Sequence, residues 1–99
     1  DSTLWTWGCN DYGQIGDGTI INKSSPVQIG SLTTWKYVSG GFYHTTALKT
    51  DGTLWTWGFN DYGELGDGTA NWRSSPVQIG SLTTWKTISG GGLHTTALK

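Results

Sequence analysis

The sequence contains no methionine, a single cysteine and two prolines in 99 residues. Because Cys9 is the only cysteine, a disulfide within the chain is excluded. The missing methionine predicts a trimmed or processed piece whose native N-terminus lies elsewhere. Fifty residues after Cys9 stands Phe59, so we expect this position to be an apolar filler, not a reactive thiol.

Charge and long apolar runs are also scarce. Six lysines and arginines face seven acids, for a formal charge of −1. Without a basic patch, nucleic acid is not an expected partner. Without a long apolar run, neither a transmembrane helix nor a secretory leader is expected, and no membrane partner. The compartment stays open.

What the sequence does have is an internal repeat. Residues 1–49 align with residues 51–99 without gaps, and they are identical at 37 of 49 positions. Thr50 is the single residue between the copies. A period of fifty with this fidelity predicts a repeat architecture.

Each copy predicts four short strands. In the first copy, runs of β-forming residues bounded by glycines or turns cover 3–7, 26–29, 35–39 and 44–49. Pro26 cannot donate to a strand ladder, so its strand suits an outer edge. Asp51-Gly52 predicts a tight hairpin into the second copy. No window has helical periodicity, so we expect an all-β chain of four-stranded antiparallel sheets.

Both faces of these strands carry apolar bulk. Leu4 points to one face of its strand, while Trp5 and Trp7 point to the other. A sheet that is apolar on both faces must be packed between neighbours. Four-stranded sheets stacked around an axis form a β-propeller, with one sheet per blade.

A resemblance to a known family lies in the run HTTALKTDGTLWTWGFNDYGELGDGT, followed by SSPVQI and by W-K-x-[VI]-S-G-G. These motifs resemble the repeat of the regulator of chromosome condensation family, and they cover the whole chain twice. The resemblance implies a propeller, usually of seven blades, with the Trp-Lys strand innermost and the Pro-Val strand outermost. Members include a nucleotide-exchange factor for a small GTPase and a bacterial β-lactamase inhibitor, and neither activity can be carried over from two repeats.

Plant ultraviolet-B photoreceptors share the fold and use tryptophan clusters linked to Gly-Trp-Arg-His-Thr motifs. The matching segments here read Gly-Gly-Phe-Tyr-His-Thr and Gly-Gly-Gly-Leu-His-Thr. Photoreception is therefore not expected. Core packing is favoured for Trp5, Trp7 and Trp35, over a chromophore array or a sugar platform.

The loop NDYGQIGDGT returns as NDYGELGDGT. We expect its glycines to adopt backbone conformations closed to other residues, and Asp17 to cap a turn. A calcium loop would need alternating acids and a closing glutamate, and the glycine order is the reverse of a dinucleotide fingerprint. A structural turn is favoured over a metal loop or a phosphate cradle, so no metal or cofactor is expected.

His44 and His94 each precede two threonines. A Ser–His–Asp arrangement can be written from residue types alone. A histidine that recurs once per repeat is better explained as a buried hydrogen-bonding group at the start of a strand. No nucleophile elbow accompanies it, so the chain is not expected to be an enzyme.

The propeller order divides the chain unevenly. Residues 1–34 are predicted to form a half blade of third and outer strands, 35–84 a full blade, and 85–99 a half blade of inner and second strands. We expect the halves to join between chains, closing a ring by strand sharing, with four chains preferred and three as the runner-up. Closure would use Thr3, Leu4, Trp5, Thr6, Trp7, His94, Thr95, Thr96, Ala97, Leu98 and Lys99.

One observation and one alternative bear on that division. Ser2 replaces the hairpin glycine, Gly52, and we expect residue 2 to be free of the hairpin's conformational demand. The alternative is that the piece comes from a longer parent that closes its own ring.

Twelve positions differ between the copies, and two clusters among them, 20–23 and 42–43 with their counterparts fifty residues later, lie on one predicted rim. Variable loops on a fixed scaffold are where a partner is recognised, although positions loosely constrained by packing also vary. The candidate partner-binding residues are Ile20, Ile21, Asn22, Lys23, Phe42, Tyr43, Ala70, Asn71, Trp72, Arg73 and Leu93. The preferred function is a non-enzymatic scaffold that assembles with itself and binds protein. The alternatives are a designed or excised repeat without a natural ligand, and carbohydrate or small-molecule binding on the rim.

Overall fold

A computed structural model of the chain describes residues 2–99. The strands are β1 (Trp5–Gly8), β2 (Lys23–Gln28), β3 (Trp35–Gly40), β4 (His44–Lys49), β5 (Leu54–Gly58), β6 (Arg73–Gln78), β7 (Thr87–Gly90) and β8 (Thr95–Leu98). The all-β prediction is confirmed, since these residues contain no helix. Over the same residues, nothing helical has the length and hydropathy to cross a bilayer.

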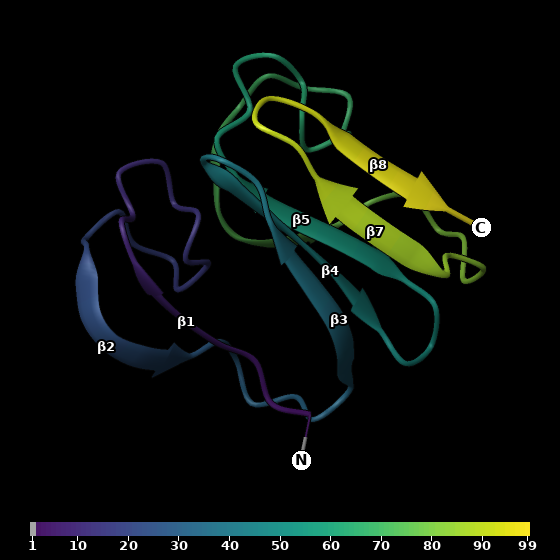
Figure 1. Ribbon diagram of the computed structural model, residues 1–99, viewed down its shortest axis with the longest axis horizontal. Coiled ribbons are helices and arrows are strands. Elements are labelled where there is room, and N and C mark those ends of the chain that lie inside the picture. Colours follow the sequence, from purple (N-terminus) through teal and green to yellow (C-terminus); the bar gives the residue numbers. More distant parts are fainter. Residues whose placement is uncertain (1) are drawn as a thin grey trace.

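The strands form three antiparallel sheets that follow one another in space (Figure 1). The central sheet has four strands in the order β3-β4-β5-β6, as predicted for a blade. On one side of it lies the pair β1-β2, and on the other the pair β7-β8, with β7 packed against β3 and β4. The assignment of residues 1–34, 35–84 and 85–99 to parts of a closed ring stays a prediction.

The two copies reproduce each other's strand pairing. Trp5 pairs with Gln28 and Gly8 with Lys23, with a register shift between them. Trp55 pairs with Gln78 and Gly58 with Arg73, with the same shift. The outer strand begins earlier than the sequence predicted, at Lys23, because the backbone after the loop already pairs with Gly8.

The main apolar core lies between β1-β2 and the central sheet. It consists of Leu4, Ile15, Ile29, Trp35, Ala47 and Trp57. Core packing was correctly predicted for Trp35, which is 8% exposed. It is wrong for Trp5 and Trp7 in the single chain, because β1 pairs only with β2 and their other side faces solvent.

Two further expectations near the start of the chain are wrong. Cys9 is exposed, whereas Phe59 is partly buried against the Tyr12 ring, 4.8 Å between centroids. Within residues 2–99, no sheet precedes β1 whose loop could cover Cys9 as the Tyr12 loop covers Phe59. Ser2 also keeps a left-handed φ of 60°, close to the 83° of Gly52. The carbonyl of Ser2 accepts from Trp35 N at 3.3 Å, and that of Gly52 from Trp85 N at 3.3 Å, so the demand on residue 2 remains.

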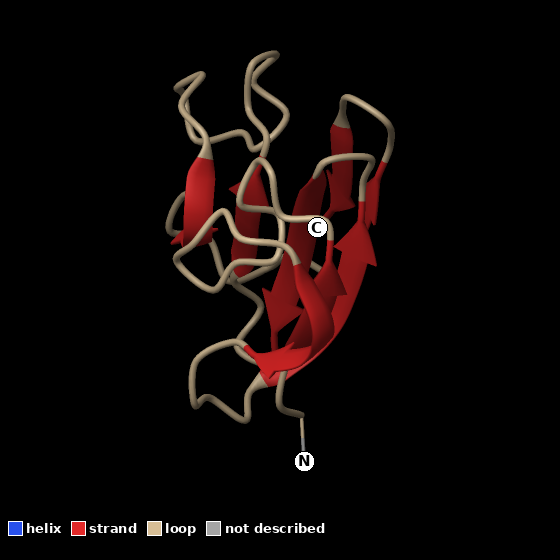
Figure 2. Ribbon diagram, turned by 90° about the vertical axis from the view of Figure 1, so that its left-hand side faces the viewer, coloured by secondary structure: helices blue, strands red, loops and turns tan. Residues whose placement is uncertain are grey.

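Loops gather at both ends of the strands (Figure 2). Because the strands alternate in direction, the β3–β4 connection and the long β5–β6 connection emerge at the same end. The β4–β5 hairpin and the β6–β7 connection emerge at the other. We call the first end the variable rim, because it carries most of the differences between the copies.

Candidate functional site

A buried asparagine organises each long loop of the variable rim. The Asn10 side-chain amide donates to Thr19 O (2.9 Å) and Ile21 O (3.1 Å), and its Oδ1 accepts from Ile15 N (2.9 Å). Asn60 repeats these bonds one copy later, and both side chains are fully buried. Each amide therefore closes the loop from within by holding main-chain groups.

The predicted turn chemistry of the loop is confirmed. Asp17 Oδ1 accepts from Thr19 N at 2.9 Å and from Thr19 Oγ1 at 2.7 Å, which is a side-chain cap of the turn. Gly16 has a φ of 87°, and a Cβ there would lie 2.5 Å from Trp57 Nε1. Over residues 2–99, no three His, Cys, Asp or Glu side chains converge in a group that could hold a metal ion.

In each repeat, a basic residue at the start of the outer strand forms an ion pair with the aspartate of this turn. Arg73 Nε lies 2.9 Å from Asp67 Oδ2, and Lys23 Nζ lies 3.7 Å from Asp17 Oδ2. Partial burial works to raise the pKa of Asp67, but bonds from Thr69, Arg73 and Asn60 outweigh it and lower the pKa to about 2. Arg73 is therefore engaged within the chain, which reduces its capacity to bind a partner.

Six aromatic side chains meet on the variable rim, and we call them the rim cluster. They are Tyr12, Phe42, Tyr43, Phe59, Tyr62 and Trp72. Tyr12 is central, with its ring 4.8 Å from Phe59, 4.8 Å from Trp72 and 4.9 Å from Tyr43. These spacings are those of favourable edge and tilted contacts.

The rim cluster is held by internal contacts and is accessible. Trp72 Nε1 donates to Asp61 Oδ1 at 2.8 Å, which fixes the indole. Phe42 is nevertheless 70% exposed and Tyr62 72%. An exposed aromatic patch of this kind is typical of an interaction surface.

Sequence reasoning found half of the rim cluster. Phe42, Tyr43 and Trp72 were predicted because they differ between the copies. Tyr12 and Tyr62 are identical in both copies, so a comparison of differences could not find them. The sequence indicated these two tyrosines only by their position, two residues after Asn10 and Asn60.

The other predicted residues lie around the cluster. Ile20 and Ile21 are exposed on the loop before β2, while the Asn22 Oδ1 accepts a hydrogen bond from Asn10 N of the same loop at 2.7 Å. Ala70 and Asn71 are exposed on the equivalent loop. Leu93 is 49% exposed and lines a cleft that also contains Tyr62.

The two histidines differ. His44 is buried, as expected, and its Nε2 lies 2.9 Å from Thr95 Oγ1 on the neighbouring sheet. Burial lowers the pKa of His44, and the charge of Glu64 opposes this only in part. His94 is exposed, contrary to expectation, because no sheet follows β8 in the chain.

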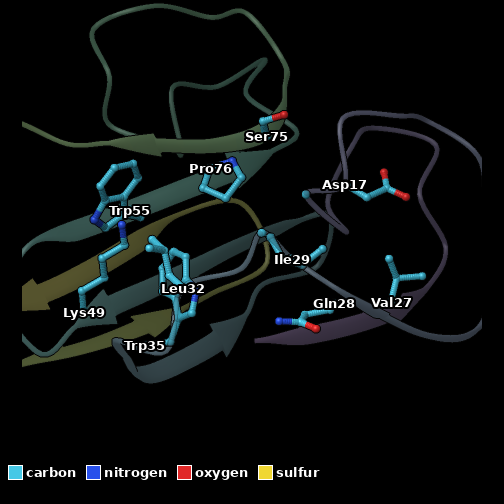
Figure 3. A pocket seen from close by; sticks show the side chains of 12 residues that line it. Asp17, Val27, Gln28, Ile29, Leu32, Trp35, Lys49, Trp55, Ser75 and Pro76 are labelled. Atoms are coloured by element: carbon cyan, nitrogen blue, oxygen red, sulfur yellow. The ribbon is translucent and has the colours of Figure 1, made fainter. Parts of the chain in front are cut away.

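A separate cleft opens between β2 and the central sheet (Figure 3). It has a volume of about 650 Å³ and is lined by Ile29, Leu32, Trp35, Lys49, Trp55 and Pro76, among others. The Lys49 side chain extends to Trp55, with Nζ 3.8 Å from the ring centroid (Figure 3). This cation–π contact occupies the one basic group in the cleft.

The predicted closure residues lie on two open edges. β1 pairs only with β2, and β8 only with β7. Trp5 is 49% exposed, Trp7 58% and Leu98 67%. The chain does not bring these two edges together, since the central sheet lies between them (Figure 1).

The fold and its repeated loops define the protein class as a β-propeller repeat protein. The sequence matches the Regulator of chromosome condensation (RCC1) repeat over residues 1–48 and 51–98, and again over 35–64. The chain therefore belongs to the regulator of chromosome condensation repeat family, and the resemblance found in the sequence is confirmed.

The chain matches parts of relatives that are longer than itself. The Ultraviolet-B receptor UVR8 of Arabidopsis thaliana is 37% identical over 51 residues, covering 50% of this chain and 12% of the receptor. The crystal structure of human WBSCR16 superposes with a TM-score of 0.85 at 25% identity, over 98% of this chain and 26% of that one.

Yeast RCC1 (Prp20), solved bound to Kap60, gives a TM-score of 0.80 at 24% identity, over 97% of this chain and 26% of that one. A second structure of Prp20p from Saccharomyces cerevisiae gives 0.77 at 24% identity, with the same coverage. The chain thus spans about a quarter of these solved relatives.

Proposed function

We propose that the chain is a non-enzymatic propeller scaffold that binds a protein partner through the rim cluster. The observation that carries the proposal is the convergence of six aromatic side chains on one accessible rim. Yeast RCC1 has been crystallised with the protein Kap60, and binding to Gsp1p and histones is named for the same yeast protein. These relatives support a protein as the ligand class.

The physics of the rim cluster favours a protein surface. Trp and Tyr are enriched at binding hot spots because they bury a large area at a low cost in side-chain entropy. Trp72 is held by Asp61 and by the Tyr12 ring before any partner arrives. A pre-ordered anchor loses little conformational freedom on binding.

The test is affinity capture with the whole chain, followed by titration of the captured protein. The variant Phe42→Ala/Trp72→Ala is expected to weaken binding by about 100-fold, which is typical of losing hot-spot residues. Leu32→Ala is the matched control, because Leu32 is also exposed but lies at the other rim. Equal binding by both variants, or a rim-dependent response on a glycan array, would contradict protein binding through the rim cluster.

We also propose that copies of the chain assemble by sharing blades in a closed ring, with four chains preferred and three as the runner-up. Support comes from the open edges of β1 and β8, whose apolar side chains are exposed. Two blades per chain give even rings. Against about 51° per blade in a seven-bladed ring, eight blades need about 45° and six about 60°, so eight is the smaller departure.

Solution mass tests the ring. Native mass spectrometry at micromolar concentration is expected to give four times the 10.7 kDa chain mass, or three times for the runner-up. A single 10.7 kDa species would contradict assembly through shared blades.

A further inference from the structure

An empty cleft lies between the central sheet and β7-β8, and we call it the β8 cleft. It has a volume of about 360 Å³. Its lining includes Leu54, Leu65, Gly66, Ile79, Trp85 and Ala97. Fifty residues earlier, five of these six positions are Leu4, Ile15, Ile29, Trp35 and Ala47, which are members of the main core.

The difference between the two places is one side chain. In the main core, the Trp57 indole fills the space, and a Cβ added to Gly16 would lie 2.5 Å from Trp57 Nε1. In the β8 cleft, a Cβ added to Gly66 would meet only Ile79 Cγ2, at 3.9 Å. The β8 cleft therefore has the same walls as the main core, but no indole of residues 2–99 fills it.

We propose that the β8 cleft is the binding site for the Trp7 indole of a second copy of the chain. That copy's β1 would pair antiparallel with β8, in the register Thr96↔Thr6 and Ala97↔Trp5. The inference deepens the shared-blade assembly proposed above and rests on it.

The register is copied from the central sheet. There β4 pairs with β5 through Thr46↔Thr56 and Ala47↔Trp55. Residues 4–8 and 54–58 are both Leu-Trp-Thr-Trp-Gly, and residues 44–49 and 94–99 are both His-Thr-Thr-Ala-Leu-Lys. The side chains that pair between β4 and β5 are therefore the same as those that would pair between β8 and the β1 of a second chain.

A carbonyl in the β8 cleft has capacity for the missing donor. Gln14 O accepts from Thr45 Oγ1 at 2.7 Å and from Trp57 Nε1 at 2.8 Å. Its counterpart Glu64 O accepts from Thr95 Oγ1 at 2.6 Å, and within residues 2–99 no indole reaches it. The Trp7 Nε1 of a second copy would supply that bond, since a carbonyl oxygen has two lone pairs.

A lysine is also placed for the second copy. Lys49 Nζ lies 5.0 Å from the Trp35 ring centroid and 3.8 Å from that of Trp55. Lys99 Nζ lies 5.2 Å from the Trp85 ring centroid, so the first of these contacts is already formed. Trp5 of the second chain would provide the second indole, against which Lys99 would lie as Lys49 lies against Trp55.

A strand of this chain fits the site better than a free apolar ligand. The edge of β8 presents backbone donors and acceptors that only an added strand can satisfy along its length. Trp7 lies on the same face of β1 as Trp5, so a β1 strand added to β8 would direct the Trp7 indole into the cleft beside it.

Disulfide trapping tests the register in a Cys9→Ser background. Thr6→Cys combined with Thr96→Cys is expected to link chains covalently on mild oxidation, because directly paired strand positions meet the distance that a disulfide requires. Thr6→Cys combined with Leu98→Cys is the matched control. Its cysteines would be two residues out of register, beyond disulfide reach, so no linkage is expected.

The outcomes separate the two proposals. An assembled mass with linkage only for the first pair supports the site and its register. An assembled mass with equal linkage for both pairs overturns the register and leaves ring assembly standing. A single-chain mass without linkage overturns both.

A second variant keeps the inference testable if the cysteine pairs fold poorly. Trp7→Ala is expected to weaken self-association by about 100-fold or more, the scale for a buried tryptophan anchor. Tyr37→Thr is the control, because Tyr37 is 52% exposed on β3 and the second repeat of the same chain has threonine, Thr87, at this position. Association of Trp7→Ala at the unmodified strength would overturn the assignment of the cleft to Trp7.

Discussion

Trp57 and Trp7 occupy the same position in two copies of the segment LWTWG, yet Trp57 is fully buried and Trp7 is 58% exposed. Leu48 and Leu98 differ in the same way, at 1% and 67% exposed. The sequences around these pairs are identical, so local propensity cannot be the cause. In a stacked repeat, burial is decided by which neighbours a strand has on either side.

The neighbours of Trp57 can be named. β4 pairs along the edge of its strand, and the loop of the preceding sheet covers the ring through Gly16 and the Gln14 carbonyl. Around Trp7 neither neighbour is present within the described chain. The comparison therefore isolates the energetic contribution of neighbours from that of sequence.

The largest expected effect comes from removing the buried ring. Trp57→Ala should lower the free energy of unfolding by about 3–5 kcal/mol, because a core cavity replaces the indole and its hydrogen bond. Chemical denaturation followed by circular dichroism measures it. At a dilution where only single chains are present, Trp7→Ala should change the unfolding free energy by less than about 0.5 kcal/mol. Equal effects on single chains would show that Trp7 is already buried.

A smaller effect is expected from His44 as the pH falls. Burial lowers the pKa of His44 below its ordinary 6.5, so the unfolded chain binds a proton more readily than the folded one. This histidine's contribution is therefore complete above pH 6.5 and is lost as the pH falls from 6.5 through the lowered folded pKa.

Replacing His44 with glutamine should flatten that part of the stability–pH curve, measured by thermal unfolding at several pH values. His94→Gln, a change of the exposed counterpart, is the matched control. A curve that His44→Gln leaves unchanged would contradict the burial argument.

The smallest effect is expected at residue 2. Ser2 has a φ of 60°, which costs a residue with a Cβ about 1 kcal/mol. Ser2→Gly should raise the thermal midpoint accordingly. Gly52→Ala should act in the opposite direction, because its φ is 83° and its Cβ would collide with the Thr83 carbonyl oxygen. A lower midpoint for Ser2→Gly would mean that the serine side chain makes a compensating contact.

The sequence was sufficient to predict the architecture, because the same strand and turn motifs occur in both repeats. The Asp51-Gly52 hairpin, the outer strand containing Pro26 and the capped turn at Asp17 all follow from local chemistry, and the structure has each of them. Local chemistry acts on every copy alike, so two copies provide two independent observations of the same rule.

The candidate site could be predicted only in part. Tyr43 and Trp72 could be selected as differences, but their convergence on Tyr12 depends on how one sheet's loop meets the next sheet. The hydrogen bond from Asn10 N to Asn22 and the ion pair of Arg73 with Asp67 depend instead on how each long loop folds on itself. Exposure of Cys9 and His94 could not be predicted from residue type, because it reflects which neighbours are absent.

The asparagine inside each rim loop has a consequence for how such proteins diversify. Asn10 and Asn60 grip main-chain oxygens at positions 19, 21, 69 and 71, and every amino acid offers such an oxygen. The side chains at 20–21 and 70–71 are therefore Ile-Ile in one copy and Ala-Asn in the other, over the same loop path. A loop held in this way can change its exposed side chains freely while the polypeptide beneath them keeps one shape.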